Sequence, residues 1–186
     1  MPQVIDRTKR GYARQEDILA AFRDRLRVAC EECDEMTCFI SDQPIPVSIP
    51  AGGGHCLTVS IGNGSFDQSL FAGGGHAALN EDSEIIVTIM IRISLDRVPQ
   101  AERALISLDR GIISRWKRDV LKALLLSDPN LGAASQPWEP LIGDKPLCRE
   151  QIRPVTATSP ADVPGHQGWV GMQIAFAVSF DWELYT

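Results

Sequence analysis

The sequence predicts a single α+β domain over residues 1–186, with a mainly antiparallel sheet and with an N-terminal helix and one long helix packed on it. Two long segments, 84–95 and 171–185, alternate apolar and polar residues with a period of two, as half-buried strands do. Two others, 14–33 and 98–129, repeat apolar residues every three or four positions, as amphipathic helices do. Segregation of helices from antiparallel strands is the mark of the α+β class.

The N-terminal helix is expected within residues 14–33. Charged residues such as Arg23 and Asp24 fall outside its apolar stripe, so one face packs on something larger. The stripe consists of Ile18, Leu19, Phe22, Leu26, Ala29 and Cys33. A stretch with three prolines follows, within residues 40–50, and it predicts an extended segment.

A hairpin is expected next. Residues 56–61 alternate as a half-buried strand, and Gly62-Asn63-Gly64 is typical of a hairpin turn, because Gly and Asn tolerate positive φ. Residues 65–71 form the return strand, and residues 72–83 are expected to be a loop that ends in acidic residues.

The two long alternating strands are expected at the centre of the sheet, because strict alternation over ten or more residues indicates one buried face. The residues predicted to lie in the core against the long helix are Ile85, Val87, Ile89, Ile91, Phe176, Val178 and Phe180.

The long helix, 98–129, starts near Pro99 and is stopped by Pro129. Its apolar stripe is Leu105, Leu108, Ile112, Trp116, Val120 and Leu124. A loop rich in Pro and Gly leads to a strand within 148–159, where Pro154 indicates an edge position or a bulge.

Composition excludes several classes of protein. The net charge of -6 argues against general affinity for nucleic acid, and no apolar run is long enough to span a membrane. The N-terminus has no apolar core, so no signal peptide is expected. Five cysteines are an odd number, which favours reduced thiols in the cytosol and predicts no disulfide.

Ala-Gly-Gly-Gly-His occurs twice, at 51–55 and 72–76. A phosphate loop would place its glycines between a strand and a helix, often with a nearby Lys, and this context is missing. Because the two stretches flank the expected hairpin, we interpret them as its base, where glycines let the backbone bend away from the sheet.

A zinc- or thiol-dependent site is the main chemical alternative. Its candidate residues are Cys30, Cys33, Cys38, His55 and His76, since a Cys-x-x-Cys with a third Cys and a His is a possible zinc set. A second Cys-x-x-Cys is missing, and cysteines at the end of an amphipathic helix are commonly buried hydrophobic residues. No G-x-S-x-G motif is present either. We therefore expect no metal, no cofactor, no catalytic residues and no enzyme.

Several segments together resemble the tail-terminator and tail-completion (neck) proteins of long-tailed bacteriophages. They are "ILAAFRDRL", "CLTVSIGNGSF", "VTIMIRISLDR", "SRWKRDVLKALL" and "AFAVSFDWEL", taken in this order. The resemblance implies one α+β domain that assembles as a hexameric ring, caps the tail tube and joins it to the neck. It also implies contacts with the tail tube protein and with neck or head-completion proteins, and DNA that passes through the lumen without specific binding.

The resemblance further implies a location in the virion, with assembly in the host cytoplasm. The alternative is a small zinc- or thiol-dependent enzyme, or a ligand-binding module, built on the cysteines and histidines named above.

Within a ring, residues 72–83 are expected at the subunit interface or along the lumen. Three glycines in a row cost roughly 1–2 kcal/mol of backbone entropy per ordered residue, which a partner chain would offset. Acidic residues there would repel DNA, and a basic patch that includes Arg110 would face a neighbouring protein. The predicted interface residues are Gly73, Gly74, Gly75, His76, Leu79, Glu81, Asp82, Arg115, Lys117 and Arg118.

Overall fold

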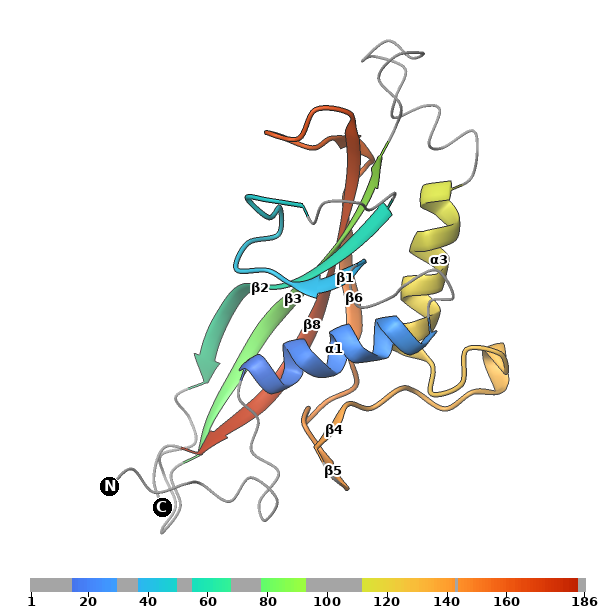
Figure 1. The fold of residues 1–186 in the computed structure, drawn as a ribbon. Helices are drawn as coiled ribbons and strands as arrows, with labels where there is room; N and C mark the ends of the chain where they lie inside the picture. Colours follow the sequence, from blue (N-terminus) through green and yellow to red (C-terminus); the bar gives the residue numbers. More distant parts are fainter. Residues whose placement is uncertain are drawn as a thin grey trace.

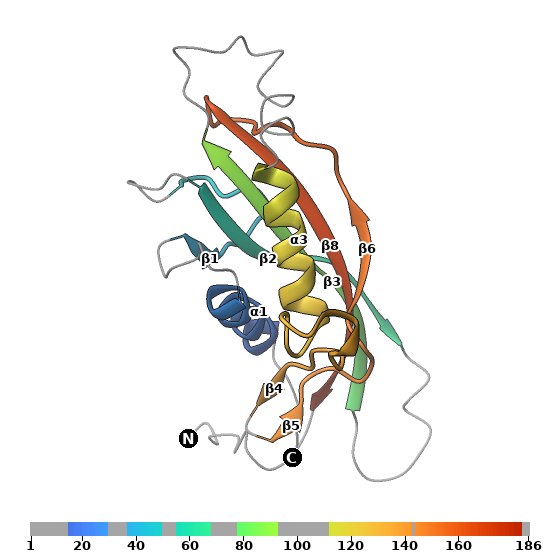
Figure 2. The same ribbon diagram turned by 90° about the vertical axis from the view of Figure 1, so that its right-hand side faces the viewer.

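The computed structural model describes residues 15–29, 37–49, 55–67, 78–92, 112–142 and 144–183. They form a six-stranded sheet with helices packed on one face (Figures 1 and 2). The elements are α1 (Gln15–Ala29), β1 (Cys38–Ile40), β2 (His55–Asp67), β3 (Ala78–Arg92), α3 (Ile112–Leu125), the 3-10 helix η3 (Gly132–Ala134), β4 (Leu141–Ile142), β5 (Lys145–Pro146), β6 (Arg153–Ala157), β7 (Ala161–Asp162) and β8 (Trp169–Glu183).

The strand order is β1-β2-β3-β8-β6, and β7 pairs with β8 beyond the end of β6. Every pair is antiparallel except β1 with β2, so the α+β class and the mainly antiparallel sheet are confirmed. A short separate hairpin joins β4 and β5. Within the described residues, no helix is long and apolar enough to cross a membrane.

Strands β3 and β8 pair over their full lengths, from Ala78 opposite Glu183 to Arg92 opposite Trp169. This pair lies inside the sheet, flanked by β2 and β6, as the alternation predicted. One hydrophobic cluster contains its inward side chains together with those of α1 and α3. All seven predicted core residues belong to it: Ile85, Val87, Ile89, Ile91, Phe176, Val178 and Phe180.

The beginning of β3 corrects the sequence prediction, which assigned residues 78–83 to a loop. The polar stretch Asn80-Glu81-Asp82 is strand, because β8 continues opposite it as far as Glu183 and bonds its backbone. Acidic residues are poor strand formers on their own, but the ladder and packing override this local preference.

Strand β2 also corrects the prediction, because Gly62-Asn63-Gly64 is not a hairpin turn. The strand runs on to Asp67 and stays paired with β3, with a register shift between Ile61 and Gly64. Neither glycine has positive φ. A Cβ on Gly64 would lie 2.7 Å from Oε1 of the Glu81 side chain, so a larger residue at this position would displace that carboxylate.

The short hairpin that these two Gly-Gly-Gly-His stretches were expected to flank is therefore not formed, because β2 continues through residues 62–64. His55 begins β2 opposite Ile91, whereas the second stretch precedes Ala78, at the other end of β3. At about 3.3 Å per residue, these two ends of the ladder are about 40 Å apart. Residues 51–54 and 72–76 themselves lie outside the described residues.

Both sheet edges carry short strands. The sequence did not predict β1, which has only three residues. The prediction for Pro154 is confirmed: β6 lies at the edge, is exposed throughout, and has a register shift between Pro154 and Thr156. Helix α3 ends at Leu125, before Pro129, while residues 98–111 of the predicted helix lie outside the described residues.

Two segments cover part of the sheet face that lies away from the helices. Residues 41–49 and 163–169 meet there, where Nε2 of His166 donates a hydrogen bond to the Pro46 carbonyl at 2.7 Å. Beneath them, Cys56, Met90 and Val163 form a second, smaller cluster. Among the described residues, no helix packs on the rest of this face.

Arg25 ties the two helices together. Its guanidinium on α1 donates hydrogen bonds to the carbonyls of Ala123, Leu126 and Ser127, at 2.9, 2.7 and 2.8 Å, and thus satisfies acceptors at the C-terminus of α3. The same group lies 5.7 Å from the centre of the Trp138 ring. A cation placed here also complements the negative end of the helix dipole.

We expect Arg25→Ala to lower the free energy of unfolding by about 2–4 kcal/mol, because three carbonyls, two of them in part-buried hydrogen bonds, lose a charged donor. Arg25→Lys should recover less than half of this loss, since an ammonium cannot reproduce the planar fork. Urea unfolding followed by circular dichroism measures both. Arg153→Ala is the matched control, because Arg153 is 71% exposed, and it should change the stability by less than about 0.5 kcal/mol. Equal stabilities of Arg25→Ala and the control would contradict this role.

Candidate subunit interface

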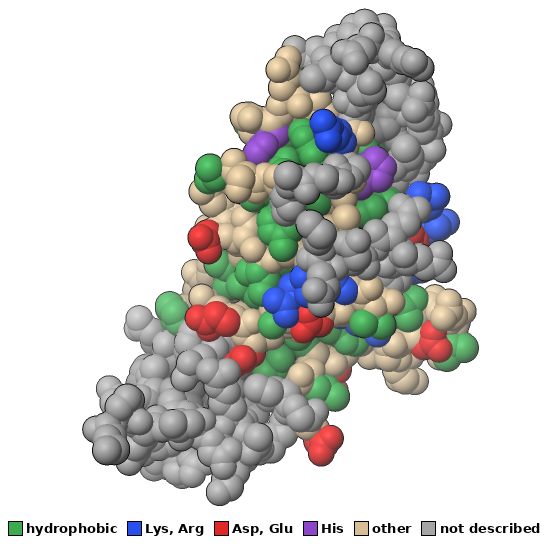
Figure 3. Space-filling view, viewed as in Figure 1, with side chains coloured by type: hydrophobic (Ala, Val, Ile, Leu, Met, Phe, Trp, Pro, Cys, Tyr) green, Lys and Arg blue, Asp and Glu red, His purple; other side chains and the backbone are tan. Residues whose placement is uncertain are grey.

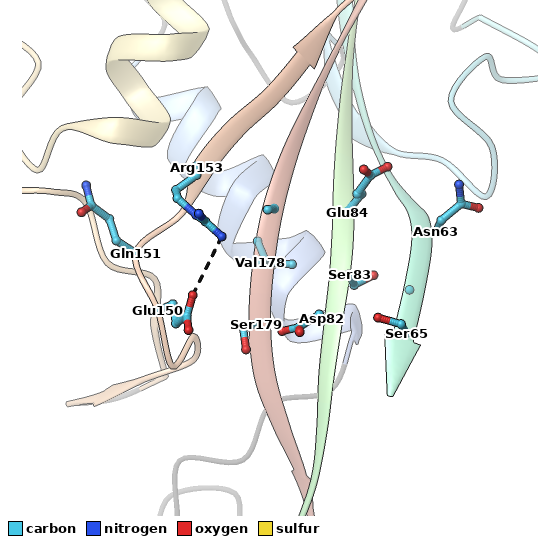
Figure 4. A pocket seen from close by; sticks show the side chains of 12 residues that line it. Asn63, Ser65, Asp82, Ser83, Glu84, Glu150, Gln151, Arg153, Val178 and Ser179 are labelled. Carbon is cyan, nitrogen blue, oxygen red and sulfur yellow. Dashed lines mark ion pairs between the residues drawn. The ribbon is translucent and has the colours of Figure 1, made fainter. Parts of the chain in front are cut away.

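An open groove of about 390 Å³ crosses the sheet face that lies away from the helices. Figure 4 views it with α1 behind the strands, and shows side chains contributed by β2, β3, β8, the start of β6 and the segment that leads into β6. The groove is lined by Asn63, Gly64, Ser65, Asp82, Ser83, Glu84, Glu150, Gln151, Arg153, Ala177, Val178 and Ser179.

The groove has an acidic excess, with three carboxylates and one guanidinium. Asp82 is exposed and Glu84 is half-buried, both on β3. Glu150 and Arg153 approach to 4.0 Å, and both side chains are about 70% exposed, so this pair adds little stability. The other lining residues carry no charge, and Ser83, Val178 and Ser179 among them are buried.

Glu81, which the sequence analysis placed at an interface or a lumen, differs from Asp82 and Glu84 in its burial. It is only 2% exposed and accepts a hydrogen bond from Nε2 of Gln15 on α1 at 3.0 Å. Neighbouring residues of a strand point to opposite faces, so Glu81 faces the helices when Asp82 faces the groove. Its carboxylate is therefore engaged within the chain.

The predicted basic residues lie on α3. Arg115 and Arg118 are exposed and Lys117 is half-buried. Arg118 forms an ion pair with Asp119, with Nε and Oδ1 3.2 Å apart. Lys122, which the sequence analysis did not single out, is exposed on the same helix.

On the face seen in Figure 3, hydrophobic side chains are interspersed with charged side chains of both signs. Neither sign of charge therefore dominates this face as a whole.

The remaining predicted interface residues are described only in part. Leu79 lies in β3 opposite Trp182. Gly73, Gly74, Gly75 and His76 lie outside the described residues, as does Arg110.

Two residues of the predicted zinc or thiol set are described. Cys38 and His55 lie near each other, because Cys38 pairs with Leu57, two positions along β2 from His55. Cys38 is fully buried, with its Sγ 3.8 Å from the Arg23 carbonyl oxygen, and His55 makes an edge contact with Trp116, ring centres 5.8 Å apart.

The described part of the chain holds no group of three His, Cys, Asp or Glu residues that could bind a metal. Cys30, Cys33 and His76 lie outside it.

Sequence reasoning missed Asn63, Ser65, Glu150 and Gln151 as neighbours in the groove. Asn63 and Ser65 were read as parts of a turn and a return strand, so their place beside β3 was hidden. Glu150 and Gln151 reach the groove only because the chain before β6 lies beside β8. The sequence feature that could have indicated the groove is the pair of acidic residues at alternate positions, Asp82 and Glu84, which lie on the same face of a strand.

No family model matches the sequence, and no curated protein matches it. Among solved structures, the chain is similar to one described as the sheath/tube terminator, in the extended state, of the extracellular contractile injection system PVC. The identity is 12% and the TM-score 0.49, over 94% of this chain and 58% of that one. This chain therefore spans somewhat more than half the length of that structure.

Two further cysteines bear on the thiol alternative. Burial raises the pKa of Cys56 to about 12, and burial together with the Glu139 carboxylate raises the pKa of Cys148 to about 12. At neutral pH both are neutral thiols, which are poor nucleophiles and poor metal ligands.

We expect Cys56 and Cys148 to resist alkylation by iodoacetamide at pH 8 in the native protein and to react after unfolding. Peptide mass mapping gives the modified fraction at each cysteine. Because the folded pKa lies above the unfolded value of 9, these thiols stabilise the fold fully below pH 9. That contribution is lost as the pH rises from 9 to 12. Rapid native alkylation of either residue would contradict the assignment.

Proposed function

We propose that this chain is a structural subunit of a phage tail or a tail-like assembly, in which copies form a ring that caps the tube. The observation that carries the proposal is the groove on the open sheet face. It is open, and its lining residues come from β2, β3, β8, the start of β6 and the segment that leads into β6. Such a surface is suited to contact with another macromolecule, because it is open and presents charged side chains from separate strands.

A thiol or zinc enzyme is less well supported. The described thiols are buried, and His55 is engaged with Trp116. A structural subunit instead needs a rigid body with surfaces that neighbours can reach. The paired strands β3 and β8 supply the rigid body, and the open groove and the exposed side of α3 supply such surfaces.

In this proposal, the ring contacts the tail tube protein on one side and neck or head-completion proteins on the other, and DNA passes through its lumen. The sequence segments that resemble phage tail-terminator and tail-completion proteins support this choice of assembly. Residues 73–76 and Asp82, together with Arg115, Lys117 and Arg118, are proposed to lie at contacts between chains.

The purified chain is expected to form a closed ring with a central hole in negative-stain images. Light scattering coupled to gel filtration should give a mass that is a whole multiple of 20.4 kDa, six for a hexamer. Dilution from 50 to 1 μM separates a stable ring from weak association. A strict monomer at every concentration would overturn the proposal of a self-assembling ring.

Deletion of residues 73–77 is expected to abolish the ring and to leave a folded monomer. The deletion lies between β2 and β3 and leaves the described ladder intact, so the melting temperature should shift by only a few degrees. Gel filtration reports assembly and circular dichroism reports folding. An unchanged ring, or a chain that no longer folds, would contradict an interface role for this stretch.

A further inference from the structure

We propose that the contact between neighbouring copies is made by the basic side of α3 in one chain and the acidic groove of the next. This inference rests on the proposed function, because it names the surfaces through which the ring would close. The occupant of the groove is thus a second copy of the same chain. Three features of the described residues support it: the charge of each surface, their placement, and the shape of the groove.

The basic side of α3 consists of Arg115, Arg118 and Lys122, all exposed. With 100° per residue, these three positions lie about 180° around the helix from the buried stripe. That stripe, Ile113, Trp116, Val120 and Leu124, packs in the main cluster. The three cations therefore point directly away from the sheet.

Charge is complementary between the two surfaces. The described residues of α3 include four cations, Arg115, Lys117, Arg118 and Lys122, and a single carboxylate, Asp119. The groove carries three carboxylates, Asp82, Glu84 and Glu150, against Arg153. Opposite charges across an interface steer association and fix its register, while like charges oppose a wrong approach.

The two surfaces lie on opposite sides of the molecule. Figure 2 shows α3 in front of β3 and β8, and Figure 4 shows the groove from the side that has α1 behind the strands. A chain with complementary surfaces on opposite sides joins head to tail. Such a heterologous contact gives a ring when the rotation per copy closes, and a filament when it does not.

The shape of the groove suits a helix. Its floor is formed by small side chains, Ser65, Ala177 and Ser179. The carboxylates of Asp82 and Glu84 rise from β3, and that of Glu150 lies across β8 (Figure 4). Cations spaced three and four positions apart on one helical side can reach carboxylates on both sides of such a floor.

Two charge reversals test the contact. Asp82→Lys with Glu84→Lys makes the groove basic, and Arg118→Glu with Lys122→Glu makes the helix acidic. Each double variant alone is expected to lose the ring, because like charges then face each other. A chain with all four changes should assemble, since its two surfaces are complementary again. Gel filtration with light scattering and negative-stain images measure assembly, and circular dichroism checks folding.

A mixture of the two double variants gives the sharpest readout. In a ring where the two variants alternate, every contact joins opposite charges. The native basic helix of the groove variant meets the native acidic groove of the helix variant, and at the next contact the acidic helix meets the basic groove. Equimolar mixing should therefore restore rings that contain both variants in a ratio of one to one, as native mass spectrometry can determine. This restoration depends on the two specific surfaces and is not expected from general changes in solubility or charge.

Asp42→Lys with Asp144→Lys is the matched control, because both residues are exposed and neither lines the groove. It alters the net charge as much as the groove variant does and should leave the ring intact. Rings that persist in either reversed variant, or no restoration on mixing, would overturn the proposed contact while leaving the ring itself in place. A native chain that never forms a ring would instead overturn the proposed function.

Discussion

The pairing of β3 with β8 is the constraint on which the rest of the molecule depends. Fifteen residues of each strand are matched without a break, and this register decides which side chains face the helices and which face the groove. Because side chains alternate along a strand, a slip of one residue would exchange the two faces. Ile85, Val87 and Phe176 would then leave the core, and the platform for α1 and α3 would be lost.

The central strand pair could be predicted from the sequence, because alternation of apolar and polar residues over many positions indicates a strand with one buried face. The prediction of secondary structure failed where one sequence pattern is compatible with two local conformations. Gly62 and Gly64 fit a tight turn and also fit a crowded strand, and only the presence of Glu81 and Glu84 alongside distinguishes the two. The three residues of β1 are too few to show a period.

The candidate interface was harder to predict than the core. The carboxylate of Glu81 is enclosed beneath α1, whereas that of Asp82 is exposed, and only the register with β8 separates these adjacent acidic residues. Glu150 joins Asp82 across the sheet through the path of the chain after α3, and the sequence contains no local sign of that path. Thus the residues that are neighbours on the surface of this fold are determined by long-range strand pairing. The residues that form the core can be predicted from the local periodicity of the sequence.

The unbroken β3–β8 ladder has a mechanical consequence. Hydrogen bonds in an antiparallel ladder run across the strands, so a load applied along the strand axis strains many of them at once. A load applied across the sheet would separate them one after another, from an edge such as β6. A body built in this way is stiff in one direction and compliant in the other. In an assembly that carries tension, the orientation of this strand pair would decide how much force each subunit transmits before it yields.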